Sequence, residues 1–370
     1  MSFAGMRIGL VGPLAPPAGG MALQTAQLAD LLRGEGAEVE IVQTNRPYQP
    51  AWAGRLPVIR AWFRLLPYLW QLWTVAGRST VMHMMANSGW SWHLFAAPAI
   101  WMARVRGTPL VVNYRGGGAA SFLQQSAPSV RATMRRSAGL IVPSGFLKQV
   151  FAEHAISASV VPNIINLSRY KPAQQAVPAS EPHLIVTRNL EDLYDNASAI
   201  RALAIVRERH PQARLTLAGT GPELARLQAL AGELGLADVV RFAGRLEREA
   251  MAGLYQSASV MLNPSLTDNM PNSVLEALAS GVPVVSTDVG GVPYLLEHER
   301  TGLLVKPAQP AELAAAVLRV LDDAALRQRL VEQGLAEVER YTWARVAPLL
   351  LQSYQQACNG SSTRSGLKSA

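Results

Sequence analysis

The chain has 370 residues, of which 49% are hydrophobic and 16% charged; this excludes a disordered protein and is long enough for two domains. A single cysteine, Cys358, excludes an internal disulfide and predicts a reducing compartment. The net charge of +8 arises in the first half, since residues 1–170 hold 15 Lys and Arg against 5 Asp and Glu, which predicts an anionic partner such as a membrane surface, a phosphorylated lipid or a nucleic acid.

Strands and helices alternate through the first half. The elements expected, in order, are strand Arg7–Val11, helix Met21–Arg33, strand Glu38–Gln43, strand Val81–Met84, helix Trp92–Val105, strand Pro109–Tyr114, strand Gly139–Val142 and helix Gly145–His154. The first strand and helix are joined by a loop that ends in Gly19 and Gly20, an arrangement that presents backbone N–H groups to an anion. The dinucleotide fingerprint and the P-loop are both missing.

The segment Arg46–Arg78 combines five arginines and seven Trp, Tyr and Phe residues with no acidic residue. A cationic, Trp-rich amphipathic stretch is typical of a membrane interface, where Arg meets anionic lipid. An ordinary surface helix with its aromatic residues in the core is the alternative. Nucleic-acid binding has no supporting motif, so we expect none. We also expect no secretory signal at the start of the chain.

Two further features of the first half concern a site and a possible membrane span. Arg115 follows a predicted strand and precedes three glycines, so we expect its side chain to project into a crevice. His83 also falls at a strand end, although a structural role is commoner for a lone histidine. Val81–Ala103 has no formal charge, but its polar residues and Pro98 predict a strand, a loop and a buried helix instead of a span.

A linker is expected at residues 171–183, which are rich in Pro, Ala and Gln. The second half repeats the alternation, with strands expected at Leu184–Thr187, Arg214–Ala218, Val239–Ala243, Ser259–Asn263, Val282–Thr287 and Thr301–Val305. This pattern predicts an α/β fold of two facing Rossmann-like doubly wound parallel-sheet domains with a cleft between them. The domains are predicted at 1–170 and 184–340, with a helix at 341–357 packing back on the first domain and a disordered tail at 358–370.

The stretch Ser259–Pro293 carries the strongest candidate site. Asp268 lies in the loop after a predicted buried strand, and Glu276 lies eight residues later in a predicted helix. Loops at the carboxyl ends of parallel strands are where ligands bind in such folds. Carboxylates only accept hydrogen bonds when ionised, so this pair suits a ligand with hydroxyl donors, such as a sugar or a ribose.

The chain resembles the retaining glycosyltransferases of family four, which have the GT-B fold. The resemblance is carried by NPSLTDNMPNSVLEALASGVPVVSTDVGG, by AGTGPE at Ala218–Glu223, by VPN at Val161–Asn163, by TGLLV at Thr301–Val305 and by the loop at Gly19 and Gly20. It covers nearly the whole chain and is strongest from Arg188 to Val305.

The resemblance implies a role for each site residue. Glu276 would bind the ribose of a nucleotide-sugar donor and Asp268 the transferred sugar, while Arg188 would neutralise the diphosphate. The remaining donor-binding residues implied are Gly19, Gly20, Gly219, Asn269, Met270, Pro271 and Asn272. Arg188, Asp268 and Arg115 are the candidate catalytic residues, and the groups at Gly19, Gly20 and Arg115 would complete the site by domain closure. The absence of a D-x-D sequence fits the family's usual independence of metals, so no metal or other cofactor is expected.

The sequence also departs from the family pattern. Asp268 stands where the family commonly has Glu, and no Lys follows Arg188 within a few residues. Arg115 stands in place of a frequent His, and Tyr294 in place of a Glu. These differences indicate a divergent subgroup.

The resulting hypothesis is a retaining hexosyltransferase that uses a UDP- or GDP-sugar. It would be cytoplasmic, associated peripherally with the inner face of the membrane, and would act on a lipid-linked or cell-envelope polysaccharide acceptor. The alternatives are a nucleotide-sugar epimerase or a phosphorylase of the same fold, or a sugar-nucleotide-binding protein without transferase activity; a dehydrogenase is disfavoured because the dinucleotide fingerprint is missing.

Overall fold

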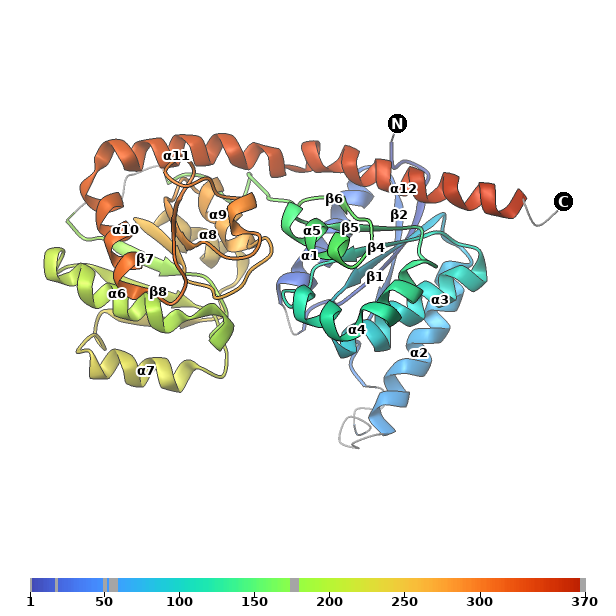
Figure 1. Ribbon diagram of the computed structural model, residues 1–370, viewed down its shortest axis with the longest axis horizontal. Helices are drawn as coiled ribbons and strands as arrows, with labels where there is room; N and C mark the ends of the chain where they lie inside the picture. The colour runs from blue at the N-terminus through green and yellow to red at the C-terminus, as the bar shows by residue number, and fades with distance from the viewer. Residues whose placement is uncertain (1, 17–18, 49–51, 53–58, 174–179, 367–370) are drawn as a thin grey trace. The chain divides into compact units, whose positions relative to one another are not determined.

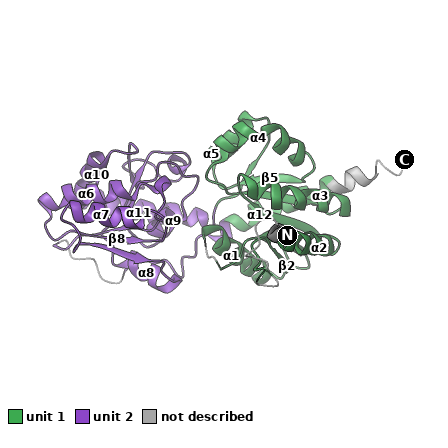
Figure 2. Ribbon diagram, turned by 90° about the horizontal axis from the view of Figure 1, so that it is seen from below, with its two compact units in different colours: residues 1–162, 346–370 green, residues 163–345 purple. Residues whose placement is uncertain are grey.

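The computed structural model describes residues 2–16, 19–48, 52, 59–173 and 180–366. The chain forms two compact units (Figure 2). Unit 1 comprises Met1–Pro162 and Val346–Ala370, and unit 2 comprises Asn163–Arg345. Each unit contains its own six-stranded sheet, in which every neighbouring pair of strands is parallel.

Unit 1 is an alternating β/α unit with strand order β2-β1-β3-β4-β5-β6 and helices flanking the sheet (Figure 1). Its elements are β1 (Arg7–Gly12), α1 (Gly20–Gly34), β2 (Glu38–Gln43), α2 (Ile59–Ala76), β3 (Val81–Ala86), a π-helical turn η2 (Trp92–Ala96), α3 (Ala97–Arg106), β4 (Leu110–Tyr114), α4 (Ala119–Met134), β5 (Gly139–Val142), α5 (Gly145–Glu153) and β6 (Ser159–Val160). The strand order changes direction between β1 and β3, so the loops after these strands diverge and leave room for a ligand.

Unit 2 has strand order β9-β8-β7-β10-β11-β12. Its elements are β7 (His183–Val186), η3 (Asp192–Tyr194), α6 (Asn196–Arg209), β8 (Arg214–Ala218), α7 (Leu224–Glu233), β9 (Val240–Gly244), α8 (Arg248–Gln256), β10 (Val260–Asn263), α9 (Asn272–Ala279), β11 (Val284–Thr287), η4 (Val292–Tyr294), β12 (Leu303–Val305), α10 (Pro310–Asp322), α11 (Ala324–Val338) and η5 (Glu339–Tyr341). Counted within the unit, the order is that of the Rossmann fold, and its direction reverses between β7 and β10.

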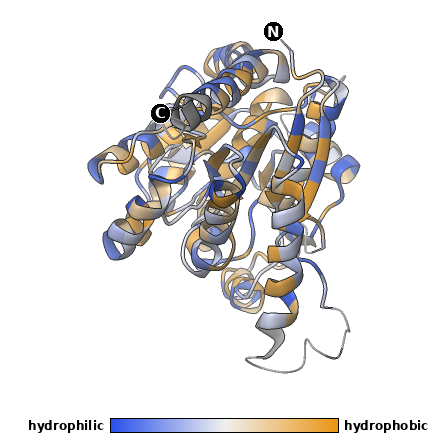
Figure 3. Cartoon of the chain, turned by 90° about the vertical axis from the view of Figure 1, so that its right-hand side faces the viewer, coloured by the Kyte–Doolittle hydropathy of each residue, from blue (hydrophilic) through white to orange (hydrophobic). Residues whose placement is uncertain are grey.

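The central strands supply the cores of both units. All residues of β3, β4, β7, β10 and β11 are buried, as expected for parallel sheets that are covered on both faces. In unit 1 the strands are predominantly hydrophobic, while the surrounding helices carry both hydrophobic and hydrophilic residues (Figure 3). The predicted doubly wound α/β fold is therefore confirmed.

The end of the chain differs from the prediction. Helix α12 spans Trp343–Gly366, so the tail expected to be disordered from residue 358 is helical as far as Gly366. The part of this helix from Val346 onward belongs to unit 1. The units divide between Pro162 and Asn163, whereas the sequence predicted the domain boundary at residue 170. Most of the expected linker, residues 174–179, lies outside the described residues.

One helix of unit 1 was missed by the sequence reasoning. Helix α4 follows the three glycines after Arg115 and runs from Ala119 to Met134. Its sequence contains Pro128 and several Ser residues, which weaken the helical signal. The helix forms nevertheless because it buries an apolar stripe that includes Phe122, Leu123 and Val130.

Close backbone approach explains the glycine after β8. A Cβ on Gly219 would overlap the carbonyl group of Arg188, which follows β7. The loops after these neighbouring strands can therefore pack together only when residue 219 has no side chain. Gly232, in the last turn of α7, has nothing within 4 Å of the corresponding Cβ position.

These two glycines give a matched pair of stability predictions. Gly219→Ala should lower the free energy of unfolding by about 1–3 kcal/mol, because the added methyl group forces the two loops apart. Gly232→Ala should raise it by about 0.5–1 kcal/mol, because alanine loses less backbone entropy in a helix. Urea denaturation of both variants tests the pair, and equal effects would contradict the close-approach explanation.

Candidate functional site

The candidate site of unit 2 lies where the strand order reverses. Strands β7 and β10 are hydrogen-bonded neighbours that run parallel. Arg188 follows β7 by two residues, and Asp268 lies in the loop between β10 and α9. Since the carboxyl ends of both strands meet at one edge of the sheet, the fold brings these residues together from positions 80 apart in the sequence.

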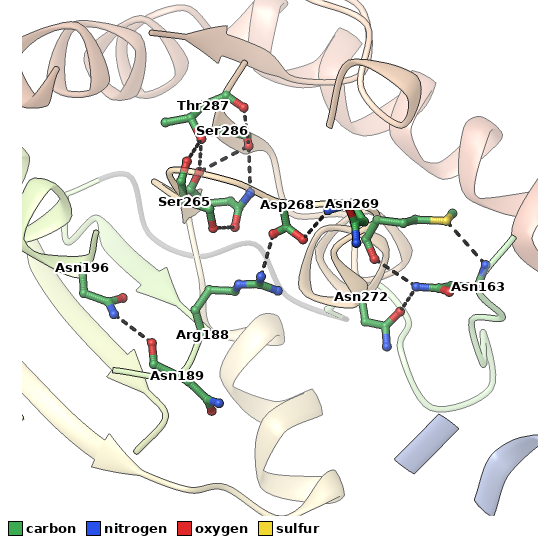
Figure 4. A network of polar contacts seen from close by, with 12 residues as sticks. Asn163, Arg188, Asn189, Asn196, Ser265, Asp268, Asn269, Asn272, Ser286 and Thr287 are labelled. Atoms are coloured by element: carbon green, nitrogen blue, oxygen red, sulfur yellow. Dashed lines mark hydrogen bonds and ion pairs between the residues drawn. The ribbon is translucent and has the colours of Figure 1, made fainter. Parts of the chain in front are cut away.

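Arg188 and Asp268 form a buried ion pair (Figure 4). The guanidinium Nη2 donates to Asp268 Oδ2 at 2.6 Å, and the two side chains are only 13% and 10% exposed. The guanidinium carbon also lies 4.1 Å from the centroid of the Tyr194 ring. Burial raises the pKa of Asp268, and the charge of Arg188 opposes this rise. The structure therefore holds a cation at the strand ends with a carboxylate and an aromatic ring as its partners.

Asn163 orders the loop that carries Asp268. Its Nδ2 lies 2.9 Å from the carbonyl oxygen of Met270 and 2.7 Å from Asn272 Oδ1, and its backbone N–H faces the Met270 sulfur at 3.5 Å. Met270, predicted to bind the donor, is therefore buried, and Asn163 contacts both its sulfur and its carbonyl oxygen. Asn163 was part of the VPN motif noted in the sequence, but its role as the support of this loop could not be read from spacing.

The late Gly-Gly pair packs against the same loop. A Cβ on Gly290 would overlap the carbonyl group of Asp268, and one on Gly291 would overlap that of Asn269. The N–H of Gly291 donates to the Asp268 carbonyl oxygen at 2.9 Å. These contacts fix the backbone of the Asp268 loop. They explain the two glycines at positions 290 and 291 by packing, independently of any ligand.

A buried polar network supports the ends of β10 and β11 beneath this loop (Figure 4). Asn263 Nδ2 donates to Ser286 Oγ at 3.0 Å, and Ser265 Oγ donates to Asn263 Oδ1 at 3.0 Å. The Thr287 hydroxyl donates to the Ser265 carbonyl oxygen at 2.6 Å. Each polar group finds a partner, which makes the base of the site rigid.

Glu276 is the fifth residue of α9, and its carboxylate accepts a hydrogen bond from a tyrosine. The Tyr255 hydroxyl, from α8, is 3.0 Å from Glu276 Oε2 and 2.7 Å from Thr187 Oγ1. Burial raises the pKa of Glu276 to about 7, while hydrogen bonds from Tyr255 and Tyr170 and the charge of Arg188 oppose the rise. The charge of Arg188 therefore acts on the pKa of both candidate carboxylates. Tyr255 and Tyr170 were not predicted, because nothing in a sequence distinguishes them from core aromatic residues.

The start of α9 lies between the two carboxylates in the sequence. Pro271 precedes the helix, Asn272 begins it, and the hydroxyl of Ser273 is buried without a hydrogen-bond partner among the described residues. A helix N-terminus carries partial positive charge and suits a phosphate or a polarised hydroxyl. The amide N–H of Asn269, by contrast, donates to Asp268 Oδ1 at 3.0 Å. In the described part of the chain, no three His, Cys, Asp or Glu residues gather as a metal site would require.

The predicted residues of unit 1 gather at the carboxyl edge of its sheet. Helix α1 begins at Gly20, directly after Gly19. A Cβ atom at either position would have no neighbouring atom within 4 Å. The Arg115 Nη1 donates to Gln24 Oε1, four residues into α1, at 3.0 Å. Arg115 is thus hydrogen-bonded to the helix that Gly20 begins.

Each of the two doubly wound units carries an arginine at the carboxyl edge of its sheet, and unit 2 adds carboxylates that can accept hydroxyl groups. Two families match the chain. Residues 19–163 match the glycosyl transferase 4-like domain, and residues 169–336 match the glycosyl transferases group 1 domain. The chain therefore contains a glycosyl transferase 4-like domain followed by a glycosyl transferases group 1 domain.

Curated relatives resemble the chain in sequence, and solved structures resemble it in fold. The chain is 34% identical to the D-inositol 3-phosphate glycosyltransferase of Corynebacterium jeikeium over 42% of this chain and 39% of the relative. It is 28% identical to the phosphatidyl-myo-inositol mannosyltransferase of Mycobacterium leprae over 96% of this chain and 98% of the relative. HepE from Anabaena, solved in complex with UDP and glucose, has the same fold, with a TM-score of 0.73, 17% identity and coverage of 95% of this chain and 99% of HepE. The alignments with several of the most similar relatives span less than half of those relatives' lengths.

Glu276 gives a prediction that depends on the structure alone. Because folding raises the pKa of this carboxyl from 4.5 to about 7, the native state should lose stability as the pH rises through this interval, by about 3 kcal/mol at 1.36 kcal/mol per pKa unit. Glu276→Gln cannot ionise, so its stability relative to the wild type should rise by a similar amount between pH 4.5 and pH 7.5. Urea denaturation at both pH values measures this, and a constant difference would show that the carboxyl is not buried as described.

Proposed function

We propose that this protein is a retaining glycosyltransferase that moves a hexose from a UDP- or GDP-sugar to a lipid-linked or cell-envelope polysaccharide acceptor. The observation that carries the proposal is the buried cluster of Arg188, Asp268 and Glu276 at the switch point of unit 2. The match of residues 169–336 to the glycosyl transferases group 1 domain and the UDP and glucose bound to HepE support a nucleotide-sugar donor. The names of the inositol-specific relatives support a phosphorylated or lipid-linked acceptor.

In this proposal each member of the cluster binds one part of the donor. Glu276 accepts hydrogen bonds from the ribose hydroxyls, and Asp268 accepts from hydroxyls of the transferred sugar. Arg188 and the N-terminus of α9 stabilise the diphosphate, whose negative charge grows as the glycosidic bond breaks. The ion pair with Asp268 holds the guanidinium in place before the donor arrives, which lowers the cost of ordering it.

The distribution of carboxylates in unit 1 favours a same-face displacement for the retaining step. A double displacement needs a carboxylate nucleophile beneath the anomeric carbon. The carboxylates of unit 1 are all exposed, and they are Asp30, Glu35, Glu38, Glu40 and Glu153. We therefore propose that the leaving phosphate helps to deprotonate the acceptor hydroxyl on the face that it departs from. Isolation of a covalent glycosyl-enzyme intermediate would rule this out. The reaction is proposed to need no metal ion.

Donor binding gives the first functional prediction. Glu276→Ala should weaken the binding of UDP-glucose or GDP-mannose at least about tenfold, because hydrogen bonds from two ribose hydroxyls to a buried charged acceptor are lost. Glu233→Ala, which removes an exposed carboxylate from α7 of the same unit, serves as the matched control and should leave the affinity unchanged. Isothermal calorimetry with each sugar nucleotide measures both.

The outcome also separates the alternative functions. Unchanged affinity in Glu276→Ala would remove the donor-site assignment. Interconversion of the donor sugar without any acceptor would identify an epimerase, and binding without donor hydrolysis or transfer would identify a sugar-nucleotide-binding protein.

The surface of unit 1 supports action at a membrane. Along α2, the exposed large apolar residues are Trp62, Leu66, Trp70 and Trp73. Their spacings of three or four residues place them on one face, opposite the buried Tyr68, Leu72 and Val75. Helix α3, which packs beside α2 (Figure 1), adds the exposed Trp101 and Val105. We call these six exposed residues the aromatic face.

Arginines accompany the aromatic face. The guanidinium of Arg106 lies 4.5 Å from the Trp73 ring, and that of Arg136 lies 4.0 Å from the Trp101 ring. Arg104 and Arg136 also line a cavity of about 130 Å³, large enough for a phosphate group. Exposed Trp beside Arg is typical of an interfacial surface that meets anionic lipid. None of the helices in the described ranges is long and apolar enough to cross a bilayer. Arg55 of the predicted segment lies outside the described residues.

We therefore propose that the aromatic face docks unit 1 onto an anionic membrane at its inner surface. The double substitution Trp62→Ala and Trp70→Ala should weaken binding to phosphatidylglycerol-containing vesicles about tenfold or more, because two interfacial rings are lost. The matched control removes two exposed leucines at α7, Leu224→Ala and Leu234→Ala, and should bind as the wild type does. Vesicle co-sedimentation measures both. Equal binding of the two double variants, or no binding by the wild type, would contradict the proposal.

A further inference from the structure

A chain of hydrogen bonds runs through unit 1 from its last helix to Arg115. Tyr354 Oη, on α12, lies 2.8 Å from His83 Nδ1 on β3. His83 Nε2 lies 3.0 Å from Asn113 Nδ2 on β4. Asn113 Oδ1 accepts from Arg115 Nε at 3.1 Å, and Arg115 Nη1 donates to Gln24 on α1 at 3.0 Å. Segments up to 271 positions apart in the sequence thus meet in one chain.

Chemistry fixes the direction of every bond in this chain. A guanidinium only donates, so Asn113 must turn its oxygen to Arg115 and its NH₂ group to His83. His83 Nε2 must then accept, which places the single proton of the neutral imidazole on Nδ1. That N–H donates to the hydroxyl oxygen of Tyr354. Burial, and then the charge of Arg115, lowers the pKa of His83 to about 3, so the ring is neutral at the pH of a cell.

The chain is buried and therefore rigid. His83 and Tyr354 are fully buried, and Asn113 is 1% exposed. A buried donor or acceptor that loses its partner is costly, so each link constrains the next. Asn113, which accepts from Nε, and Gln24, which accepts from Nη1, together set the plane of the Arg115 guanidinium. That cation lies next to the first turns of α1, where Gly19 and Gly20 present the start of the helix.

We propose that Tyr354 is a positioning residue for Arg115, acting through His83 and Asn113. The last helix of the chain thereby fixes the orientation of a cation at the carboxyl edge of the unit 1 sheet. The inference rests on the proposed function, sugar transfer, for which Arg115 is a candidate catalytic residue. His83, which was predicted at a strand end, is the third of the six residues of β3 and forms the middle of this relay.

Kinetics of the full chain test the relay. Tyr354→Phe removes only the hydroxyl and keeps the ring packing against Phe3. It should lower kcat for hydrolysis of UDP-glucose or GDP-mannose roughly tenfold, with little change in KM for the donor. Arg115→Lys should lower kcat further, and the double variant Tyr354→Phe with Arg115→Lys should be no worse than Arg115→Lys alone.

A second buried tyrosine provides the matched control. The Tyr68 hydroxyl donates to the carbonyl oxygen of Phe95 at 2.8 Å, on the core side of α2 and away from the relay. Tyr68→Phe loses a comparable bond, so its stability should fall as much as that of Tyr354→Phe while kcat stays at the wild-type value. Equal kcat values in the two variants, or independent effects of Tyr354→Phe and Arg115→Lys, would overturn the positioning role and leave the proposed function intact.

Nuclear magnetic resonance of the full chain tests the relay without any activity. In a histidine-labelled sample, with His83 assigned by His83→Asn, the ring should show the neutral Nδ1–H tautomer. Tyr354→Phe should shift the Nε–H signal of Arg115, and Tyr68→Phe should not. The opposite tautomer or an unshifted arginine signal would overturn the inference. If the wild type hydrolysed and transferred neither donor sugar, the proposed function would fall, and the arginine signal would still decide whether Tyr354 orders Arg115.

Discussion

The buried ion pair between Arg188 and Asp268 is the interaction on which the candidate site depends. Two charges at 2.6 Å, each about nine-tenths buried, are tolerated only when they satisfy one another and their neighbours. Strand β7 must lie beside β10 for the pair to form, and the loop after β10 must fold back on itself. Asn163, Gly290 and Gly291 supply that folding. The motif that points to the family is thus also the set of residues that makes a buried charge pair possible.

The two units hold their arginines by different means. In unit 2 a carboxylate binds the guanidinium of Arg188, and a second carboxylate, Glu276, lies within its electrostatic reach. In unit 1 the amides of Asn113 and Gln24 bind Arg115, while every carboxylate of that unit is exposed. An arginine held by neutral amides keeps its full positive charge for an anion, whereas one paired with a carboxylate is largely neutralised.

Some arginines of the first half lie on the aromatic face, in addition to Arg115 at the carboxyl edge of the sheet. The arginines that stack on Trp73 and Trp101 lie far along the sequence from those tryptophans. The sequence identified one aromatic segment, and packing of α2 beside α3 extends it into a face that two helices share. Apolar area and charge are then available together, which is the combination that anionic interfaces select.

The sequence by itself determined the doubly wound architecture, the position of the acidic stretch and the family, because buried parallel strands are continuous apolar runs and the motif has fixed spacing. It could not assign Tyr255, Tyr170, Asn163 or Tyr354, since their roles arise from contacts between distant segments, and it missed α4 and the last turns of α12, whose polar composition hid a helix. Tertiary structure alone decided that Asp268 is paired with Arg188, that Glu276 is buried beside a tyrosine, and that His83 is neutral and bonded. The physical reason is that burial and pairing, which set charge and orientation, depend on what surrounds a side chain rather than on its neighbours in the chain.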